Sequence, residues 1–227
     1  MREISLDTET TGFKPTDGHR LVEIGCVELI NRIPTGNVFH KYINPQRDMP
    51  EPAFNVHGLS EEFLSDKPLF KDIADEFLEF IGDSRLIIHN AQFDMAFLNA
   101  ELTWAKKKEI PYAQTFCTLQ EARSRFPGSP ASLDALCKRF NVDNSAREKH
   151  GALLDAEILA EMYLELMGGS QVALELGGQS SSSSISSGVE NLKREETLEA
   201  RSFPPSEDDL KNHQEFLKKI NEPAWHA

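Results

Sequence analysis

Hydrophobic and polar positions over the first 167 residues alternate between strand-like and helix-like periods. Apolar stretches rich in β-branched residues are typical of strands, and they occur at 4–9, 21–30 and 38–43. Gly, Pro and Asp between positions 12 and 18 predict a turn that links the first two strands. A short apolar run at 85–88 predicts one further strand.

Apolar residues at i, i+3, i+4, i+7 and i+8 predict an amphipathic helix over 70–81. The same spacing predicts later helices over 91–102, 132–140 and 151–167. Three strands joined by short turns, followed by alternating helices and strands, are typical of an α/β fold. We therefore expect a mixed sheet flanked by helices.

The composition of the chain changes near residue 168. Two glycine pairs, at 168–169 and 177–178, precede a tract of seven serines interrupted by Ile185. This tract cannot bury enough apolar surface to order itself, so it predicts a linker. We expect one folded domain over 1–169, a Gly/Ser-rich linker over 170–189 and a flexible C-terminal tail over 190–227.

The 227 residues carry a formal net charge of −13. Such a chain is not expected to hold nucleic acid by a broad basic surface, because that binding depends on Lys and Arg releasing counterions. A polyanionic substrate would need bound divalent cations or a partner subunit to offset the repulsion. No apolar run reaches the roughly 18 residues that span a bilayer, and the N-terminus has no secretory pattern. The sequence therefore predicts no membrane segment and a cytoplasmic protein.

Asp7 and Glu9 lie two positions apart in the first predicted strand. The two-residue period of a strand points both side chains to one face, with Leu6 and Thr8 on the other. Two like charges side by side in an apolar strand are costly unless a cation neutralises them. A sheet face open to solvent is the alternative interpretation of this pair.

A third carboxylate, Asp94, lies in the sequence HNAQFD at 89–94, directly after the strand predicted at 85–88. Ligands in open α/β sheets bind beyond the carboxyl ends of the strands, so a site is expected here. Asp94 equally fits a residue that interacts favourably with a helix dipole, and Asn90 fits a helix N-cap.

The sequence HGALLDA at 150–156 begins the last predicted helix. At about 100° per residue, His150 and Asp155 would point to different faces of one helix. We therefore expect His150 on the preceding loop, where Gly151 permits an irregular backbone. Asp155 stands among leucines, where a bare carboxylate is costly. A surface histidine and a partly buried structural aspartate are the alternatives.

Together, these residues have the inventory of a two-ion phosphoryl-transfer site: Asp7, Glu9, Asp94, Asp155 and His150. Oxygen ligands favour hard cations, here Mg²⁺ or Mn²⁺, over zinc. Two ions about 3.5 to 4 Å apart would hold a phosphate, one activating water and the other stabilising the leaving 3′ oxygen. Histidine titrates near neutral pH and suits removal of the water's proton.

Four segments resemble the exonuclease motifs of the DEDDh family: LDTETTG at 6–12, VHGL at 56–59, HNAQFD at 89–94 and HGALLDA at 150–156. TFC at 115–117 and SLDALC at 132–137 resemble the same family, and within it the chain is similar to the epsilon, or proofreading, subunits of bacterial DNA polymerase III. The resemblance covers residues 3 to about 169. It implies a ribonuclease-H-like sheet, with two ions bound by the four carboxylates and His150 as general base.

The resemblance also implies which residues contact the DNA 3′ end: Asp7, Glu9, Pro52, His57 and Asp155. His57 would contact the terminal nucleotide, with a capped loop histidine as the alternative. The family has a Pro-Glu-Ala-Phe stretch before this histidine, whereas this chain reads PEPAF at 50–54, with an extra proline. Either Glu51 or Pro52 is therefore expected to line the substrate pocket.

In that family the segment after the domain carries a short sliding-clamp motif and then a stretch that binds the polymerase. Here Gln179 is followed by serines and Ile185, without an aromatic anchor, so clamp binding is expected to be weak or absent. The tail is expected to dock on the polymerase catalytic (alpha) subunit through Leu210, Phe216, Leu217, Ile220 and Trp225. A disordered amphipathic tail is the alternative. Whether a small accessory (theta-like) subunit also binds is left open by the sequence.

The sequence is compatible with three candidate functions. The first is a metal-dependent 3′ to 5′ proofreading exodeoxyribonuclease, and tethering to a polymerase would let so acidic a nuclease reach DNA. The second is a related RNA-trimming exonuclease, since only a contact near the 2′-OH would discriminate. The third is a non-catalytic scaffold. The tail favours the first function over the second, and the complete set of carboxylates argues against the third.

Overall fold

The computed structural model describes residues 1–145, 147, 149–169 and 205–217. The chain divides into two units, Met1–Leu176 and Gly177–Ala227, and each is described by itself. The predicted linker at 170–189 and the clamp-like segment lie outside the described residues. In the predicted tail the structure describes one helix, α8 (Glu207–Leu217). Among the described helices, none combines the length and apolar character that a membrane crossing requires.

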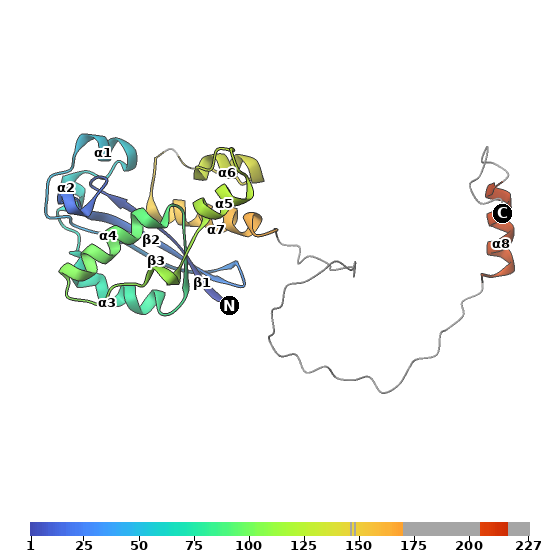
Figure 1. Ribbon diagram of the computed structural model, residues 1–227, viewed down its shortest axis with the longest axis horizontal. Coiled ribbons are helices and arrows are strands. Elements are labelled where there is room, and N and C mark those ends of the chain that lie inside the picture. The colour runs from blue at the N-terminus through green and yellow to red at the C-terminus, as the bar shows by residue number, and fades with distance from the viewer. Residues whose placement is uncertain (146, 148, 170–204, 218–227) are drawn as a thin grey trace, which may run out of the picture. The chain divides into compact units, whose positions relative to one another are not determined.

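A mixed five-stranded sheet in the order β3-β2-β1-β4-β5 forms the centre of the first unit (Figure 1). β1 pairs antiparallel with β2 and parallel with β4. β3 adds antiparallel to β2, and β5 adds parallel to β4. The strands are β1 (Arg2–Thr10), β2 (Leu21–Ile30), β3 (Ile33–Tyr42), β4 (Arg85–Ile88) and β5 (Thr115–Cys117). The mixed sheet expected from the sequence is confirmed, whereas β5 is too short to reveal a period.

The described helices of this unit are α1 (Glu51–His57), α2 (Glu61–Leu64), α3 (Phe70–Ile81), α4 (Ala91–Trp104), α5 (Thr118–Arg125), α6 (Leu133–Phe140) and α7 (Ala152–Leu166). Short 3₁₀ turns lie at Pro15–Asp17 and Tyr112–Gln114. The four helices predicted from apolar spacing correspond to α3, α4, α6 and α7. The sequence pattern does not reveal α1, α2 or α5, because one or two turns carry too few apolar residues to show a helical period.

Alternate residues of the strands build apolar layers on the two faces of the sheet. On one face Ile4 and Leu6 of β1 belong to a buried cluster that includes Phe77 of α3 and Leu98 of α4. On the other face, Val27 and Leu29 of β2 join Ala156, Ala160 and Tyr163 of α7. The sheet is thus covered by α3 and α4 on one side and by α7 on the other, as a flanked mixed sheet requires.

Gly25 of β2 lets α7 approach the sheet closely. A Cβ atom at this position would collide with the backbone of Ala152 and Leu153 in the first turn of α7. Gly25 is also the cross-strand neighbour of Asp7. The absence of a side chain at one position therefore brings the N-terminal turn of α7, which carries Asp155, to the acidic strand.

Candidate active site

A cleft of about 700 Å³ opens where the carboxyl ends of β1 and β4 meet the beginnings of α4, α6 and α7. All five residues singled out for catalysis line it: Asp7, Glu9, Asp94, His150 and Asp155. The ligand atoms of Glu9, His150 and Asp155 lie within 4.8 Å of one another. Residues spread over almost 150 positions of the sequence therefore converge at the sheet edge where parallel strands place a site.

The carboxylates of this cleft are largely withdrawn from water. Glu9 is 8% exposed, and Asp94 and Asp155 are each 2% exposed, whereas Asp7 is half-buried. A solvent-exposed sheet face, the alternative considered for the Asp7 and Glu9 pair, is therefore wrong for Glu9. Glu23 of β2, itself buried, lies directly across from Glu9 and adds a further carboxylate.

Burial raises the pKa values of Asp7, Glu9 and Asp94, and neighbouring carboxylates add to it for Asp7 and Glu9. Burial, followed by the charges of Asp155 and Glu23, raises the pKa of Glu9 to about 8. Burial, followed by the charges of Asp94 and Glu9, raises the pKa of Asp7 well above its ordinary value. Burial also raises the pKa of Asp94 to about 7. A cleft in which carboxylates hold protons so tightly has an excess of negative charge that a bound cation would relieve.

Asp94 enters the cleft from the first turn of α4. The Oγ1 of Thr8 donates a hydrogen bond of 2.7 Å to its Oδ1. Asn90 occupies the N-cap position with a left-handed backbone, φ 69°, but its side chain makes no capping hydrogen bond. Asn90 is thus the N-cap residue of α4 by position, as one interpretation of the sequence predicts, but without a capping hydrogen bond from its side chain. Its backbone forms the sharp turn from β4 into α4, a conformation that Asn tolerates better than most residues.

His150 lies before α7, as the helix geometry predicts, and Gly151 is the N-cap residue. The backbone N–H of His150 donates to the carbonyl of Val56, 3.2 Å away, and this hydrogen bond connects the loop to α1. The His150 Nδ1 lies 3.2 Å from Oδ2 of Asp155, and its side chain is 47% exposed. Gly151 is extended, φ −152°, with open space around it, so the loop does not require glycine here.

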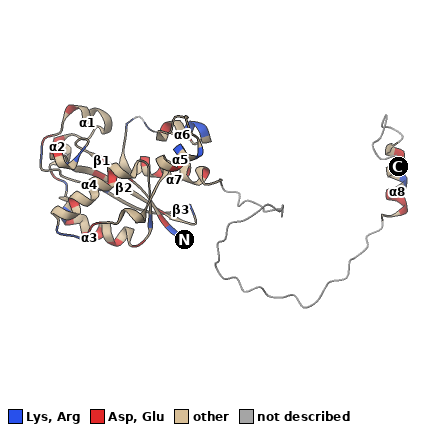
Figure 2. Ribbon diagram, in the orientation of Figure 1, with Lys and Arg blue, Asp and Glu red and all other residues tan. Residues whose placement is uncertain are grey.

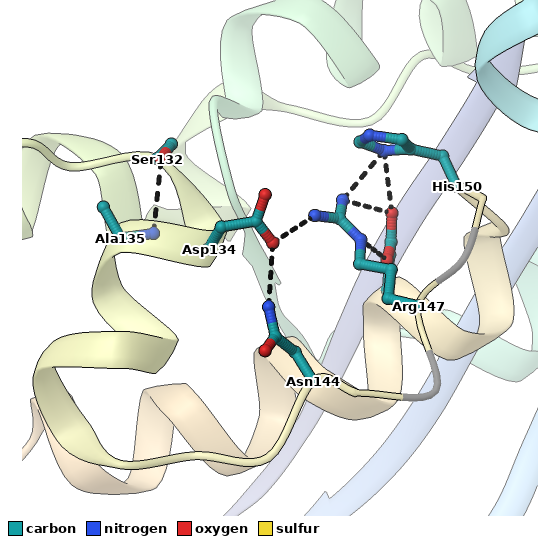
Figure 3. A network of polar contacts seen from close by, with 7 residues as sticks. Ser132, Asp134, Ala135, Asn144, Arg147 and His150 are labelled. Atoms are coloured by element: carbon teal, nitrogen blue, oxygen red, sulfur yellow. Dashed lines mark hydrogen bonds and ion pairs between the residues drawn. The ribbon is translucent and has the colours of Figure 1, made fainter.

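Arg147 is a cleft residue that the sequence reasoning misses. Its guanidinium donates to both carboxylate oxygens of Asp155, Nε to Oδ1 at 2.5 Å and Nη2 to Oδ2 at 2.7 Å. Nη1 donates to Asp134 at 2.6 Å, and Nη2 lies 2.8 Å from His150 Nδ1 (Figure 3). Burial lowers the pKa of Arg147, but the hydrogen bonds and charges of both aspartates outweigh it and raise the pKa. The available signal was a cation three positions before His150.

Among the histidines of the cleft, His89 is tied to the fold. Its Nδ1 lies 3.0 Å from Thr118 Oγ1. Burial lowers the pKa of His89 to about 4, so its ring is neutral at physiological pH. His150, which is half exposed on a loop, is the histidine with access to a substrate.

The residues expected to contact the substrate from α1 do not line this cleft. Glu51 and Pro52 are both exposed on the first turn of α1, where a proline is tolerated because the N–H groups there have no helical partner. His57, 6% exposed, is on the last turn of that helix and not on a loop. Its Nδ1 accepts a hydrogen bond from the Leu59 N–H at 3.0 Å, while among the described residues its buried Nε2 has no partner.

The α5 and α6 side of the cleft contributes one arginine and one aspartate, Arg123 and Asp134. Arg123 of α5 lines the cleft beside the loop that leads to α6, and Ser132 caps α6 by accepting from the Ala135 N–H at 3.3 Å. Figure 2 shows Lys and Arg on α5 and α6, which also carry the acidic residues Glu121 and Asp134.

Comparison with known proteins gives concordant results. An exonuclease family model (RNase_T) matches residues 4–163. The chain is 54% identical over 229 residues to the DNA polymerase III subunit epsilon of Rickettsia conorii, covering 99% of each chain. It is 43% identical over 239 residues to the subunit of that name from Salmonella typhimurium, covering 100% of this chain and 98% of that one.

Solved structures share the fold. Exonuclease X in complex with 5′ overhanging duplex DNA matches with a TM-score of 0.56 and 27% identity, over 74% of this chain and 92% of that one. The nuclease domain of 3′hExo, a DEDDh family member bound to rAMP, matches with a TM-score of 0.62 at 16% identity, over 73% and 91% of the two chains. The ribonuclease-H-like sheet expected from the sequence is confirmed.

Proposed function

Since this chain belongs to the DNA polymerase III epsilon subunits of the DEDDh exonuclease family, we propose that it hydrolyses DNA from the 3′ end with two bound divalent ions. As a proofreading subunit it would release nucleoside monophosphates from mispaired ends. The observation that supports this proposal is the convergence of Glu9, His150 and Asp155 within 4.8 Å, in a cleft that Asp7 and Asp94 also line.

The side chains of the cleft fit divalent ions. Four carboxylates offer oxygen ligands of the kind that Mg²⁺ and Mn²⁺ prefer. Burial raises the pKa values of Asp7, Glu9 and Asp94, and neighbouring carboxylates add to this for Asp7 and Glu9, so a bound cation would stabilise their ionised forms. We propose that Asp7, Glu9, Asp94 and Asp155 hold the ions, which when bound would polarise the phosphate and lower the pKa of water.

His150 is proposed to take the proton of the attacking water. Its imidazole lies outside α7 and half exposed, so it can reach a water in front of the carboxylates. The water oxygen bonds to phosphorus, and the bond from phosphorus to the 3′ oxygen of the preceding nucleotide breaks. The leaving oxygen takes up a proton, which yields a nucleoside 5′-monophosphate and a new 3′ hydroxyl.

His57 is proposed to bind the terminal nucleotide. When its ring is neutral, Nδ1 accepts from the Leu59 N–H, so Nε2 carries the proton and is a donor without a partner among the described residues. A buried unpaired donor costs free energy that a substrate oxygen would recover. We propose that Pro52 also contacts the nucleotide, together with Asp7, Glu9 and Asp155.

The tail is proposed to bind the catalytic (alpha) subunit of the polymerase. The helix α8 leaves Leu210 and Phe216 exposed, 49% and 58%, as expected for a helix that docks its apolar side chains on a partner. In this proposal residues 1–169 form the nuclease, 170–189 the linker and 190–227 the docking segment, with weak or no clamp binding. A replication subunit of this kind would work in the cytoplasm.

Truncation after Gly169 should leave hydrolysis of short DNA intact and abolish co-purification with the alpha subunit.

Digestion of labelled oligonucleotides by the purified full-length chain tests the proposed activity. We expect Mg²⁺ or Mn²⁺ to support release of nucleoside monophosphates from single-stranded and mispaired DNA ends, and chelator to stop it. RNA 3′ ends form the parallel arm. The double variant Asp7→Ala, Glu9→Ala should lose release while retaining the tail's partner binding. Absence of ion-dependent release by the wild type would refute the proposal.

A further inference from the structure

The guanidinium group of Arg147 forms hydrogen bonds with two of the proposed site residues, Asp155 and His150. The Arg147 side chain is 9% exposed and the Asp155 side chain 2%, so their ion pair is shielded from water. Because both Asp155 oxygens accept from Arg147, at 2.5 and 2.7 Å, the carboxylate has a positive partner on each oxygen. Planar bidentate pairs of this type are among the strongest charge-assisted hydrogen bonds.

The same group also engages the lone pair of His150. Arginine is only a donor, so the contact of 2.8 Å between Nη2 and Nδ1 requires Nδ1 to accept. A neutral imidazole that accepts at Nδ1 carries its proton on Nε2 and has no free lone pair left for a water proton. In this arrangement Arg147 occupies both Asp155 and His150, so neither is free for the chemistry assigned to it. Figure 3 shows the contact between Arg147 and His150.

These contacts conflict with the role of Asp155 as an ion ligand. A divalent ion bound to the carboxylate oxygens would stand where the guanidinium now donates, and two cations repel each other in a site of low dielectric. The third contact of Arg147 is different, because Asp134 is 61% exposed and holds the guanidinium from the opposite side. Asn144 steadies this carboxylate by donating to it at 3.0 Å. Asp134 can therefore retain the arginine after Asp155 is released.

We propose that Arg147 is an internal cation that neutralises Asp155 in the ion-free enzyme and is displaced from it when a divalent ion binds. The inference rests on the proposed function. It makes Arg147 a positioning residue: it keeps Asp155 and His150 ordered before the ion arrives, at the cost of competing with that ion. Arg147 then lowers ion affinity, although it lies in the cleft and supports its structure.

The test compares Mn²⁺ binding and thermal unfolding of the full-length wild type and Arg147→Gln. We expect Arg147→Gln to bind Mn²⁺ more tightly, on the order of tenfold, because the substitution removes charge-assisted hydrogen bonds from the ion-free state alone. For the same reason its Tm should fall by roughly 4 °C or more in chelator and approach the wild-type Tm in saturating Mn²⁺.

Two further variants make the result specific. Arg123→Gln removes a cation from the same cleft that forms no ion pair with the described residues, so its Mn²⁺ affinity should change by less than about twofold. Arg147→Lys keeps the charge but loses the bidentate geometry, and should bind Mn²⁺ about threefold more tightly than the wild type. Arg147→Lys also provides the answer if Arg147→Gln does not fold.

The outcomes separate the inference from the function on which it rests. If Arg147→Gln or Arg147→Lys binds Mn²⁺ as the wild type does or more weakly, or loses equal Tm with and without Mn²⁺, Arg147 supports the ion-bound state and the inference is wrong. An equal gain in Arg123→Gln would reduce the effect to general charge and also overturn it. If the wild type and Asp155→Asn bind Mn²⁺ equally, the proposed function fails as well.

Discussion

Thr8 of β1 donates a hydrogen bond of 2.7 Å to Asp94 of α4, and both side chains are buried. The bond joins a strand to a helix 86 positions later in the sequence and fixes one proposed ion ligand against the strand that carries two others. It also lowers the pKa of Asp94, in opposition to burial, which raises that pKa to about 7. Thr8 therefore helps Asp94 to be ionised near neutral pH, where an ion can bind it.

Removing this hydrogen bond should weaken ion binding in a pH-dependent way. Thr8→Val keeps the shape and loses the donor, and a hydrogen bond to a charged group contributes about 1.5 to 3 kcal/mol. We expect Mn²⁺ affinity at pH 7 to fall about tenfold, with a smaller loss at pH 9, where Asp94 is ionised in both proteins. Thr8→Ser, which keeps the hydroxyl, should behave as the wild type. A loss that is equal at both pH values would count against this role.

The raised pKa of Glu9 predicts a pH-dependent stability difference between the wild type and Glu9→Gln in chelator. Folding raises this pKa from 4.5 to about 8, so the folded state binds the proton more tightly than the unfolded chain does. The contribution of Glu9 to stability is therefore full below pH 4.5 and is lost as the pH rises towards 8. We expect Glu9→Gln to gain stability relative to the wild type across this interval.

Saturating Mn²⁺ should reverse that comparison, because the ion stabilises the ionised carboxylate and Gln offers a weaker ligand. Denaturant unfolding at several pH values, with and without Mn²⁺, measures both effects. A stability difference that stays constant from pH 4.5 to 8 in chelator would show that Glu9 titrates normally.

Gly25 predicts a structural route to loss of function. Gly25→Ala places a methyl group against the backbone of Ala152 and Leu153, so α7 must shift or the sheet must distort. We expect a loss of about 1 to 3 kcal/mol in unfolding free energy and weaker Mn²⁺ binding, since Asp155 moves with α7. Gly151→Ala is the matched control, because Gly151 is extended and faces open space. Its stability should change by less than about 0.5 kcal/mol.

Substitution of His150 should separate the effect on proton transfer from the effect on ion binding. His150→Ala should lower kcat by about 10²- to 10⁴-fold, the usual contribution of a general base, and leave Mn²⁺ affinity within about threefold. Single-turnover digestion and Mn²⁺ titration measure the two quantities. Since the His150 ring lies among the atoms within 4.8 Å of Glu9 and Asp155, a comparable loss of ion affinity would identify it as a ligand instead.

Periodicity predicts most of the fold and the position of the cleft, but not its internal contacts. The apolar patterns of β2 and α3 are long enough to fix their boundaries, and the place of Asp94 after β4 follows from strand polarity. The bond from Thr8 to Asp94 and the pairing of Glu23 beside Glu9 depend on contacts distant in sequence, which local patterns do not encode. Arg147 is missed for that reason, since its partner Asp134 precedes it by 13 residues.

Other features came from resemblance alone. Nothing in the local pattern around His57 or Pro52 indicates a nucleotide, and α1 is too short to show a period. The unpaired Nε2 of His57 becomes visible only once its burial is known. The sequence also suggested that Gly151 gives the His150 loop its freedom, whereas the close approach of backbone occurs at Gly25.

Anomalous diffraction from crystals of the full-length protein grown with Mn²⁺ and a nucleoside monophosphate tests the central claim most directly. The account predicts two Mn²⁺ peaks in the cleft, ligated by Asp7, Glu9, Asp94 and Asp155, with the Arg147 guanidinium no longer on Asp155. Peaks located elsewhere, or Asp94 and Asp155 turned away from any ion in the cleft, would contradict it.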